Sequence, residues 1–74
     1  MPVIKVEMFA GRSPEKKREL ARSLTEAFLN TCGGKPESVQ VIFQDISKED
    51  WAIGGRIAAD LYPDPAAAAP KRSA

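Results

Sequence analysis

The 74-residue sequence contains no histidine and a single cysteine, Cys32. Histidine is the one side chain whose ordinary pKa allows acid–base work near neutral pH, so its absence removes the most common catalytic base. One cysteine cannot form an internal disulfide, and one cysteine without histidine makes a structural zinc site implausible as well. We interpret Cys32 as a small core or helix-end residue rather than a nucleophile, because no histidine accompanies it.

The sequence also lacks an excess of charge of either sign, since 11 Lys and Arg face 10 Asp and Glu for a net charge of +1. No global field therefore draws the protein to nucleic acid or to an anionic membrane. Its apolar runs are too short to cross a bilayer, and the N-terminus lacks the features of a secretory signal. Together with the unpaired cysteine, these absences predict a cytoplasmic protein.

The chain is short enough that its own core is a weak source of stability. A core of this size supplies only about 3–5 kcal/mol, and disulfides and structural zinc are not available to add to it. We therefore expect an oligomer. The last residues, 63–74, read PDPAAAAPKRSA, which cannot build a core and predicts a mobile tail after a folded domain of residues 1–62.

A strand and a helix are predicted in the first half of the domain. Apolar residues alternate along residues 3–10, which is typical of a half-buried strand that Gly11 ends. Ser13 is a suitable N-cap with Pro14 at the first helical position, and apolar residues then recur at helical spacing until Gly33. The basic run of residues 16–18 is interpreted as a solvated face of this helix.

A second strand follows at residues 39–46, with apolar side chains on both of its faces, as in a strand that is covered on both sides. A strand, a helix of about five turns and a strand form a β-α-β unit with two parallel strands and a right-handed crossover. Residues 51–55, WAIGG, predict a tight hairpin. The fold class is thus α+β. Because the helix covers only one face of the sheet, a second subunit is expected to cover the other.

The most interesting candidate for chemistry is Pro2. The α-amine of a chain has an ordinary pKa of about 7.7–8, and initiator methionine is ordinarily removed before a small residue such as proline. Removal would expose a rigid secondary amine at the start of a buried strand. Apolar surroundings and a nearby cation such as Arg12 would both favour its neutral, basic form. Many proteins have proline as their second residue, however, so Pro2 by itself is weak evidence for a catalytic amine.

Other motifs accompany Pro2 in a fixed order. They are Gly11-Arg12-Ser13, the helix start Pro-Glu-Lys-Lys, the strand Ser-Val-Gln-Val-Ile-Phe and the hairpin Trp-Ala-Ile-Gly-Gly. In this combination the sequence resembles the 4-oxalocrotonate tautomerase family over roughly Pro2 to Tyr62. The resemblance is specific for the superfamily but does not identify a substrate.

The resemblance implies a homohexamer, a trimer of dimers, with active sites at subunit contacts. It implies an isomerase that needs no cofactor and whose terminal proline moves a proton within a small, anionic, unsaturated 2-oxo acid. Pro2 matches that catalytic proline, and Arg12 matches an arginine that holds a substrate carboxylate, a task suited to the guanidinium fork. Trp51 falls where the family has an aromatic residue that keeps the surroundings of the amine apolar.

Gln40 departs from the family pattern. Well-studied members carry an arginine there, which polarises the 2-oxo group, whereas a neutral amide can donate a hydrogen bond but supplies no charge. Loss of one such donor can cost about 10²–10³ in rate, so activity on the standard dicarboxylate is in question. The indole N–H of Trp51, the side chain of Arg56 or that of Lys5 could substitute.

Simpler interpretations of these residues stay open. Arg12 could be a solvated arginine, Trp51 an aromatic that packs at an interface, and Gln40 an exposed strand residue. Two alternative functions also remain. The chain could be a superfamily relative that acts as a hydratase, dehalogenase or decarboxylase through the same proline, or a non-catalytic binding subunit of an oligomer.

Overall fold

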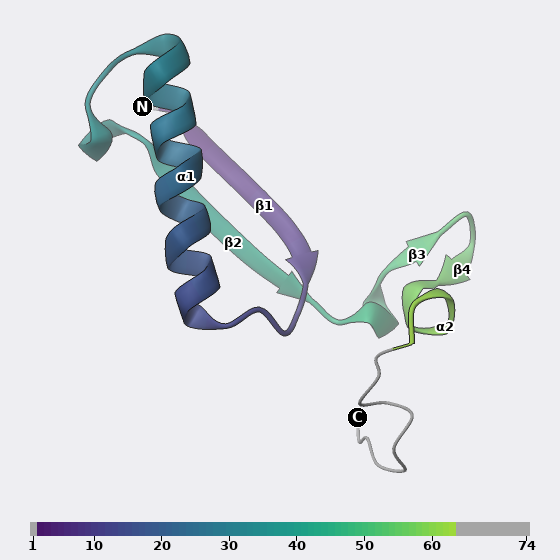
Figure 1. Cartoon of the computed structure of the whole chain (residues 1–74). Helices are drawn as coiled ribbons and strands as arrows, with labels where there is room; N and C mark the ends of the chain where they lie inside the picture. Colours follow the sequence, from purple (N-terminus) through teal and green to yellow (C-terminus); the bar gives the residue numbers. More distant parts are fainter. Residues whose placement is uncertain (1, 64–74) are drawn as a thin grey trace.

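The chain folds as a strand, a long helix, a second strand and a small hairpin that runs into a short helix (Figure 1). The structure is a computed structural model and describes residues 2–63. Apart from Pro63, the tail predicted at residues 63–74 lies outside the described residues. The elements are β1 (Val3–Phe9), α1 (Pro14–Cys32), a 3-10 turn (Pro36–Ser38), β2 (Gln40–Ile46), a second 3-10 turn (Lys48–Asp50), β3 (Ala52–Ile53), β4 (Arg56–Ile57) and α2 (Ala58–Leu61).

The two long strands, β1 and β2, are parallel, as the β-α-β pattern predicts. Their register runs from Val3 opposite Gln40 to Phe9 opposite Ile46. One further backbone bond extends the ladder, because the N–H of Ala10 donates to the carbonyl of Ile46 at 2.9 Å. The two strands therefore pair along their whole length.

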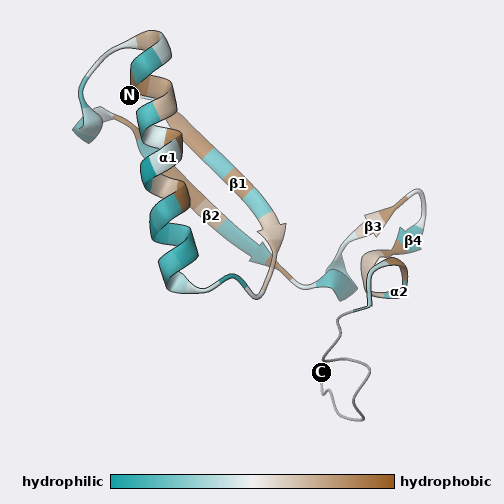
Figure 2. Ribbon diagram, viewed as in Figure 1, coloured by the Kyte–Doolittle hydropathy of each residue, from teal (hydrophilic) through white to brown (hydrophobic). Residues whose placement is uncertain are grey.

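Helix α1 begins and ends at the predicted signals. The Ser13 hydroxyl accepts a hydrogen bond from the N–H of Lys16 at 3.2 Å, which satisfies one of the free donors of the first turn. At the other end Gly33 has a φ of 80°, and its N–H donates to the carbonyl of Leu29 at 2.9 Å. Figure 2 shows the first turns of α1 as strongly hydrophilic, with apolar residues along the two strands behind it.

The predicted hairpin is present as β3 and β4, which pair antiparallel. Its turn is made by Gly54 and Gly55, whose φ values of 60° and 83° are typical of the tight turns that glycine favours. Helix α2 and the 3-10 turn at Lys48–Asp50 were not predicted from the sequence. The N–H of Ala58 donates to the carbonyl of Trp51 at 2.7 Å, so α2 folds back onto the start of the hairpin.

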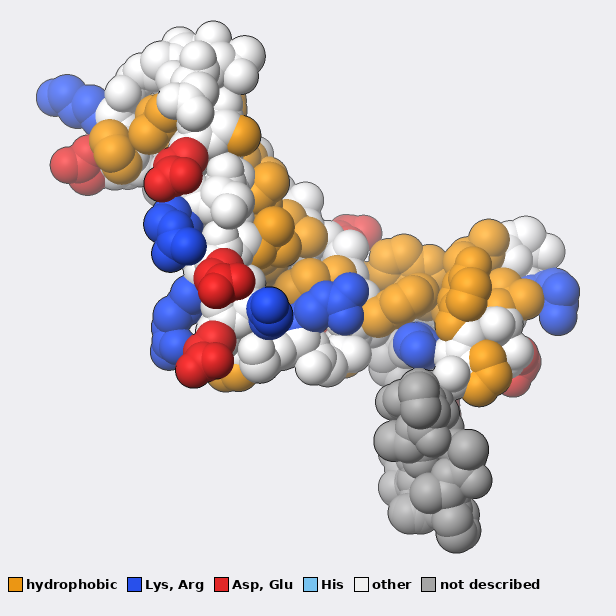
Figure 3. Space-filling view, viewed as in Figure 1, with side chains coloured by type: hydrophobic (Ala, Val, Ile, Leu, Met, Phe, Trp, Pro, Cys, Tyr) orange, Lys and Arg blue, Asp and Glu red, His pale blue; other side chains and the backbone are white. Residues whose placement is uncertain are grey.

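Little apolar surface is fully buried within one chain. Among residues 2–63, Ala58 is the only buried hydrophobic residue, at 0% exposure. Val3 and Ile42 lie on the face of the sheet opposite α1, with 54% and 47% of their surfaces exposed. Figure 3 shows hydrophobic side chains gathered beside the helix and over the hairpin. The described chain therefore leaves apolar side chains uncovered on the hairpin and on this face of the sheet, which also carries the charged pair Lys5 and Glu7.

No helix among residues 2–63 has both the length and the apolar character that crossing a bilayer requires.

Candidate functional site

Pro2 lies immediately before β1 and is half-buried. Its carbonyl accepts a hydrogen bond from the backbone N–H of Gln40 at 2.9 Å. This bond ties Pro2 to the first residue of the neighbouring strand, so the backbone at Pro2 is held although the regular strand begins only at Val3. The ring of proline removes further freedom by fixing φ.

Gln40 is the first residue of β2 and is exposed. Its Cα pairs with that of Val3, and its N–H is bonded to Pro2. The structure therefore brings Gln40 and Pro2 together at one end of the sheet. Gln40, which carries a side-chain amide, and Pro2, which precedes β1, are therefore neighbours within a single chain.

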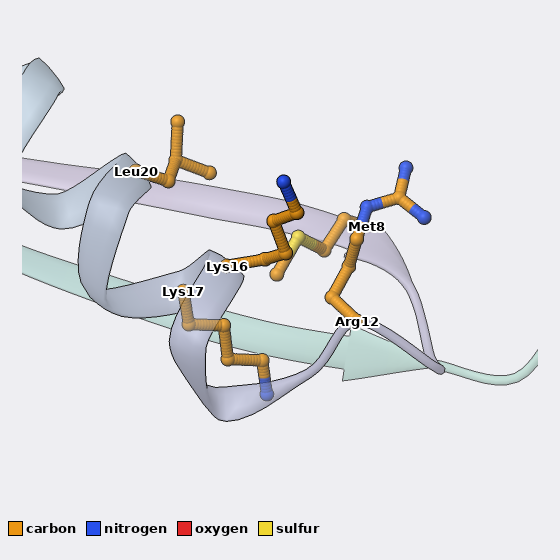
Figure 4. Close-up of a pocket in the computed structure, with 5 residues that line it drawn as sticks. All are labelled: Met8, Arg12, Lys16, Lys17 and Leu20. Atoms are coloured by element: carbon orange, nitrogen blue, oxygen red, sulfur yellow. The ribbon is translucent and has the colours of Figure 1, made fainter.

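Arg12 lies in the loop between β1 and α1, beyond the opposite end of β1, and is exposed. It lines a surface pocket of about 360 Å³ together with residues of β1 and of the first two turns of α1 (Figure 4). Within the described part of the chain no carboxylate lies within salt-bridge distance of Arg12. Its guanidinium is thus available to an anion.

Trp51 is half-buried and precedes β3. Its ring meets that of Phe9 edge-on, with centroids 4.6 Å apart and planes at 66°. Phe9 also faces Tyr62 with centroids 6.4 Å apart, and the Nζ of Lys48 lies 5.6 Å from the Phe9 centroid. The same Nζ donates to the Tyr62 carbonyl at 2.9 Å, so one lysine links the aromatic group to the end of α2.

The four candidate residues form two pairs at opposite ends of the sheet. Pro2 and Gln40 lie where β1 begins, whereas Arg12 and Trp51 lie beyond its end (Figure 1). Seven strand residues rise by roughly 23 Å. A small oxo acid cannot reach across that distance, so no single chain brings all four residues to one substrate.

The two cations that the sequence offers in place of an arginine at position 40, Lys5 and Arg56, lie in different elements. Lys5 lies in the middle of β1 and faces Glu7 with 3.7 Å between Nζ and Oε2, an exposed and weak pair. Arg56 lies in β4 of the hairpin and is exposed. Lys5 is two residues along β1 from Val3, which pairs with Gln40, and shares its face of the sheet, whereas Arg56 belongs to the hairpin.

In the basic run at the start of α1, which the sequence predicts to be a solvated face, Lys16 and Arg18 are exposed and Lys17 is half-buried. Lys17 forms a salt bridge with Asp45 of β2, with 2.6 Å between Nζ and Oδ2 and only 28% and 36% of the two side chains exposed. Lys16 instead lines the Arg12 pocket with Met8 and Leu20. Sequence reasoning missed this pocket; the available signal was that Lys16 lies one helical turn from Leu20 and just after Arg12.

In the described range no group of three or more His, Cys, Asp and Glu side chains gathers where it could share a metal ion. The candidate residues Pro2, Arg12, Gln40 and Trp51 offer an amine if Met1 is removed, a guanidinium, an amide and an indole. These groups can move a proton, bind a carboxylate, donate to an oxygen and keep surroundings apolar.

Known proteins match this chain over nearly all of its described length. The family model described as "Tautomerase enzyme" matches residues 2–61. The 2-hydroxymuconate tautomerase of Bacillus subtilis strain 168 is 34% identical over 61 residues, which is 82% of this chain and 98% of that protein.

Solved structures agree in fold. TomN, a 4-oxalocrotonate tautomerase homologue in the tomaymycin biosynthetic pathway, superposes with a TM-score of 0.80 at 38% identity, covering 86% of this chain and 98% of the other. A heterohexamer 4-oxalocrotonate tautomerase from Chloroflexus aurantiacus gives a TM-score of 0.77 at 34% identity, with 82% and 98% covered. On these matches and on its β-α-β fold with a C-terminal hairpin, the chain belongs to the tautomerase family.

Proposed function

We propose that the protein is a cofactor-independent tautomerase that uses the secondary amine of Pro2 as its general base, after Met1 has been removed. The observation that carries the proposal is the 2.9 Å hydrogen bond from the N–H of Gln40 to the carbonyl of Pro2. This bond holds Pro2 by its carbonyl group. It does not involve the ring nitrogen, which is the atom that we propose as the base. A positioned base of this kind contributes about 10²–10⁴ to a rate.

The reaction is a proton shift within an unsaturated 2-oxo acid. From a 2-oxo acid the neutral Pro2 nitrogen takes a proton from the carbon next to the carbonyl, and the electron pair of that C–H bond moves into a conjugated dienolate. From an enol such as phenylenolpyruvate it takes the hydroxyl proton instead, which leaves the enolate. The protonated amine then returns the proton to a carbon further along the chain. Atoms and electrons balance without an oxidant, and the amine ends in its starting form.

Arg12, Gln40 and Trp51 support this step in our proposal. Arg12 binds the substrate carboxylate, because its guanidinium is exposed beside a pocket and no described carboxylate pairs with it. Gln40 donates its amide N–H to the developing enolate oxygen, since it adjoins Pro2. Trp51 supplies apolar surface that disfavours the charged form of the amine.

The site is completed by a second copy of the chain. Pro2 and Gln40 of one chain lie at the opposite end of the sheet from Arg12 and Trp51 of the same chain. A partner that packs on the uncovered face in the opposite direction would bring its own Arg12 and Trp51 to the first chain's Pro2. The exposed side chains of Val3 and Ile42 lie on that face, and we propose a homohexamer built from such dimers.

Blocking the amine tests the proposal directly. We expect intact mass to show loss of Met1, and a variant with one uncleaved residue before Pro2 to lose almost all activity on phenylenolpyruvate, because an amide nitrogen is not a base. The matched control is the protein with the same residue added at the C-terminus, which should stay active. Activity close to wild type in the N-terminally extended protein would refute Pro2 as the base and favour a non-catalytic binding subunit.

A further inference from the structure

The face of the sheet that α1 leaves uncovered carries two opposite charges near the middle of β1. Residues that pair across neighbouring strands point to the same face, so the register of β1 and β2 defines which side chains share it. Lys5 lies opposite Ile42, and Glu7 lies opposite Gln44. Within the two strands they are the only charged residues on a face made of Val3, Lys5, Glu7, Phe9, Gln40, Ile42, Gln44 and Ile46.

Lys5 and Glu7 of one chain neutralise each other poorly. The Nζ of Lys5 is 3.7 Å from the Oε2 of Glu7, and 54% of each side chain is exposed. An ion pair this long and this exposed contributes little to stability. A partner that covers the face removes water from both charges, which is unfavourable unless each charge gains a close opposite charge. The partner of this face must therefore supply one acidic and one basic group.

A second copy of the chain carries these two groups in the required order. β1 spans Val3–Phe9, so its middle residue is Val6, with Lys5 and Glu7 one position to either side. When two β1 strands run in opposite directions with their ends aligned, Lys5 lies level with the partner's Glu7, and Glu7 lies level with the partner's Lys5. Packed sheets are roughly 10 Å apart, a gap that a facing lysine and glutamate can span. Charges of opposite sign then face each other at both positions.

We propose that Lys5 and Glu7 are a self-recognition pair, which selects a second copy of this chain as the partner and fixes its register. The inference rests on the proposed function, in which an antiparallel second copy completes the site. A partner displaced by two residues would place Lys5 against the partner's Lys5, or Glu7 against the partner's Glu7, and facing like charges are unfavourable. The aligned register also brings Pro2 level with the partner's Ala10, next to the loop that carries Arg12.

Charge reversal tests the pair. Lys5→Glu gives each chain two negative charges on this face, and Glu7→Lys gives each chain two positive charges, so like charges meet when either variant pairs with itself. We expect each variant alone to need about tenfold more protein than the wild type before half of its chains are assembled, measured by light scattering over a dilution series.

Two combinations should restore assembly. An equal mixture of Lys5→Glu and Glu7→Lys places opposite charges at both positions, so it should assemble at the wild-type concentration, and native mass spectrometry should find the two variants in equal numbers. The double variant Lys5→Glu/Glu7→Lys exchanges the two charges within one chain and should also assemble as the wild type does. Restored assembly of the mixture would also show that each single variant still folds.

Arg18→Glu is the control, because Arg18 is exposed on α1 and its reversal changes the charge by the same amount as Lys5→Glu. It should leave the concentration for half assembly unchanged. The inference would be overturned if the single variants assembled like the wild type, if Arg18→Glu weakened assembly as strongly as they do, or if neither the mixture nor the double variant restored assembly.

Measuring assembly separates this inference from the proposed function, because the readout does not depend on catalysis. If the wild-type protein were assembled but did not turn over phenylenolpyruvate, the proposed function would fail, and restored assembly in the mixture would still support the pair. A wild-type protein that stayed monomeric throughout the dilution series would overturn the inference, whatever its activity.

Discussion

The rings of Phe9 and Trp51 meet edge-on at 4.6 Å, and this contact joins the end of β1 to the start of the hairpin. The two residues are 42 positions apart in the sequence, and no regular backbone pairing links the sheet to the hairpin. The aromatic contact and the bond from the Ala58 N–H to the Trp51 carbonyl therefore hold Trp51 in place. Trp51, which we propose as part of the site, is thus positioned by contacts with residues that are not part of the site.

Phe9→Ala should release Trp51. We expect a loss of about 1–2 kcal/mol in the free energy of unfolding, less than for a fully buried phenylalanine because Phe9 is half-buried. The emission of Trp51, the only tryptophan, should shift to the red as the ring becomes more hydrated. Phe9→Leu, which keeps apolar volume, is the control and should shift it less. An unchanged emission spectrum in Phe9→Ala would show that Phe9 does not hold the indole.

The uncovered face of the sheet leads to a prediction about assembly. Ile42 is 47% exposed and lies on the face that α1 does not cover, and Ile42→Lys places a charge there. If a second copy packs on this face, burial of an unpaired charge should dissociate the oligomer. Light scattering at micromolar concentration should then report a smaller mass than for wild type.

Ser23→Lys is the control for Ile42→Lys, since Ser23 is exposed on α1. It adds the same side chain on the opposite side of the sheet and should leave the mass unchanged. A wild-type protein that is already a folded monomer at this concentration would contradict the oligomer, and an Ile42→Lys protein of full mass would show that the interface lies elsewhere.

The sequence was sufficient to predict the elements of the fold because their signals are local. Ser13 and Gly33 bound the helix, and the alternation of apolar residues marks the first strand. The edge-on contact of Phe9 with Trp51 could not be predicted, because it depends on how the hairpin leaves the sheet. Helix α2 was missed for a similar reason, since four residues carry too little periodicity to be recognised.

The candidate site was predicted less completely than the fold. The resemblance identified Pro2, Arg12, Gln40 and Trp51 as one group, whereas the described chain separates them into two pairs at the ends of β1. Their separation follows from the length of a strand, but only the folded chain shows which residues share an end. The different roles of Lys16 and Lys17 also required the structure, because adjacent helical residues point in different directions.

The final prediction concerns pH and the proposed base. If the free amine of Pro2 is the catalyst, kcat/KM for phenylenolpyruvate should rise tenfold per pH unit at low pH and level off above a single ionisation. In the proposed dimer, apolar surroundings and the partner's Arg12 would both disfavour the charged amine, so its pKa should lie below that of an unperturbed prolyl amine. Pro2→Ala keeps an amine but makes it primary and less rigid, so activity should fall sharply without vanishing while the oligomer persists. A pH profile that is flat from pH 5 to 9, or one that falls as pH rises, would contradict a neutral amine as the base.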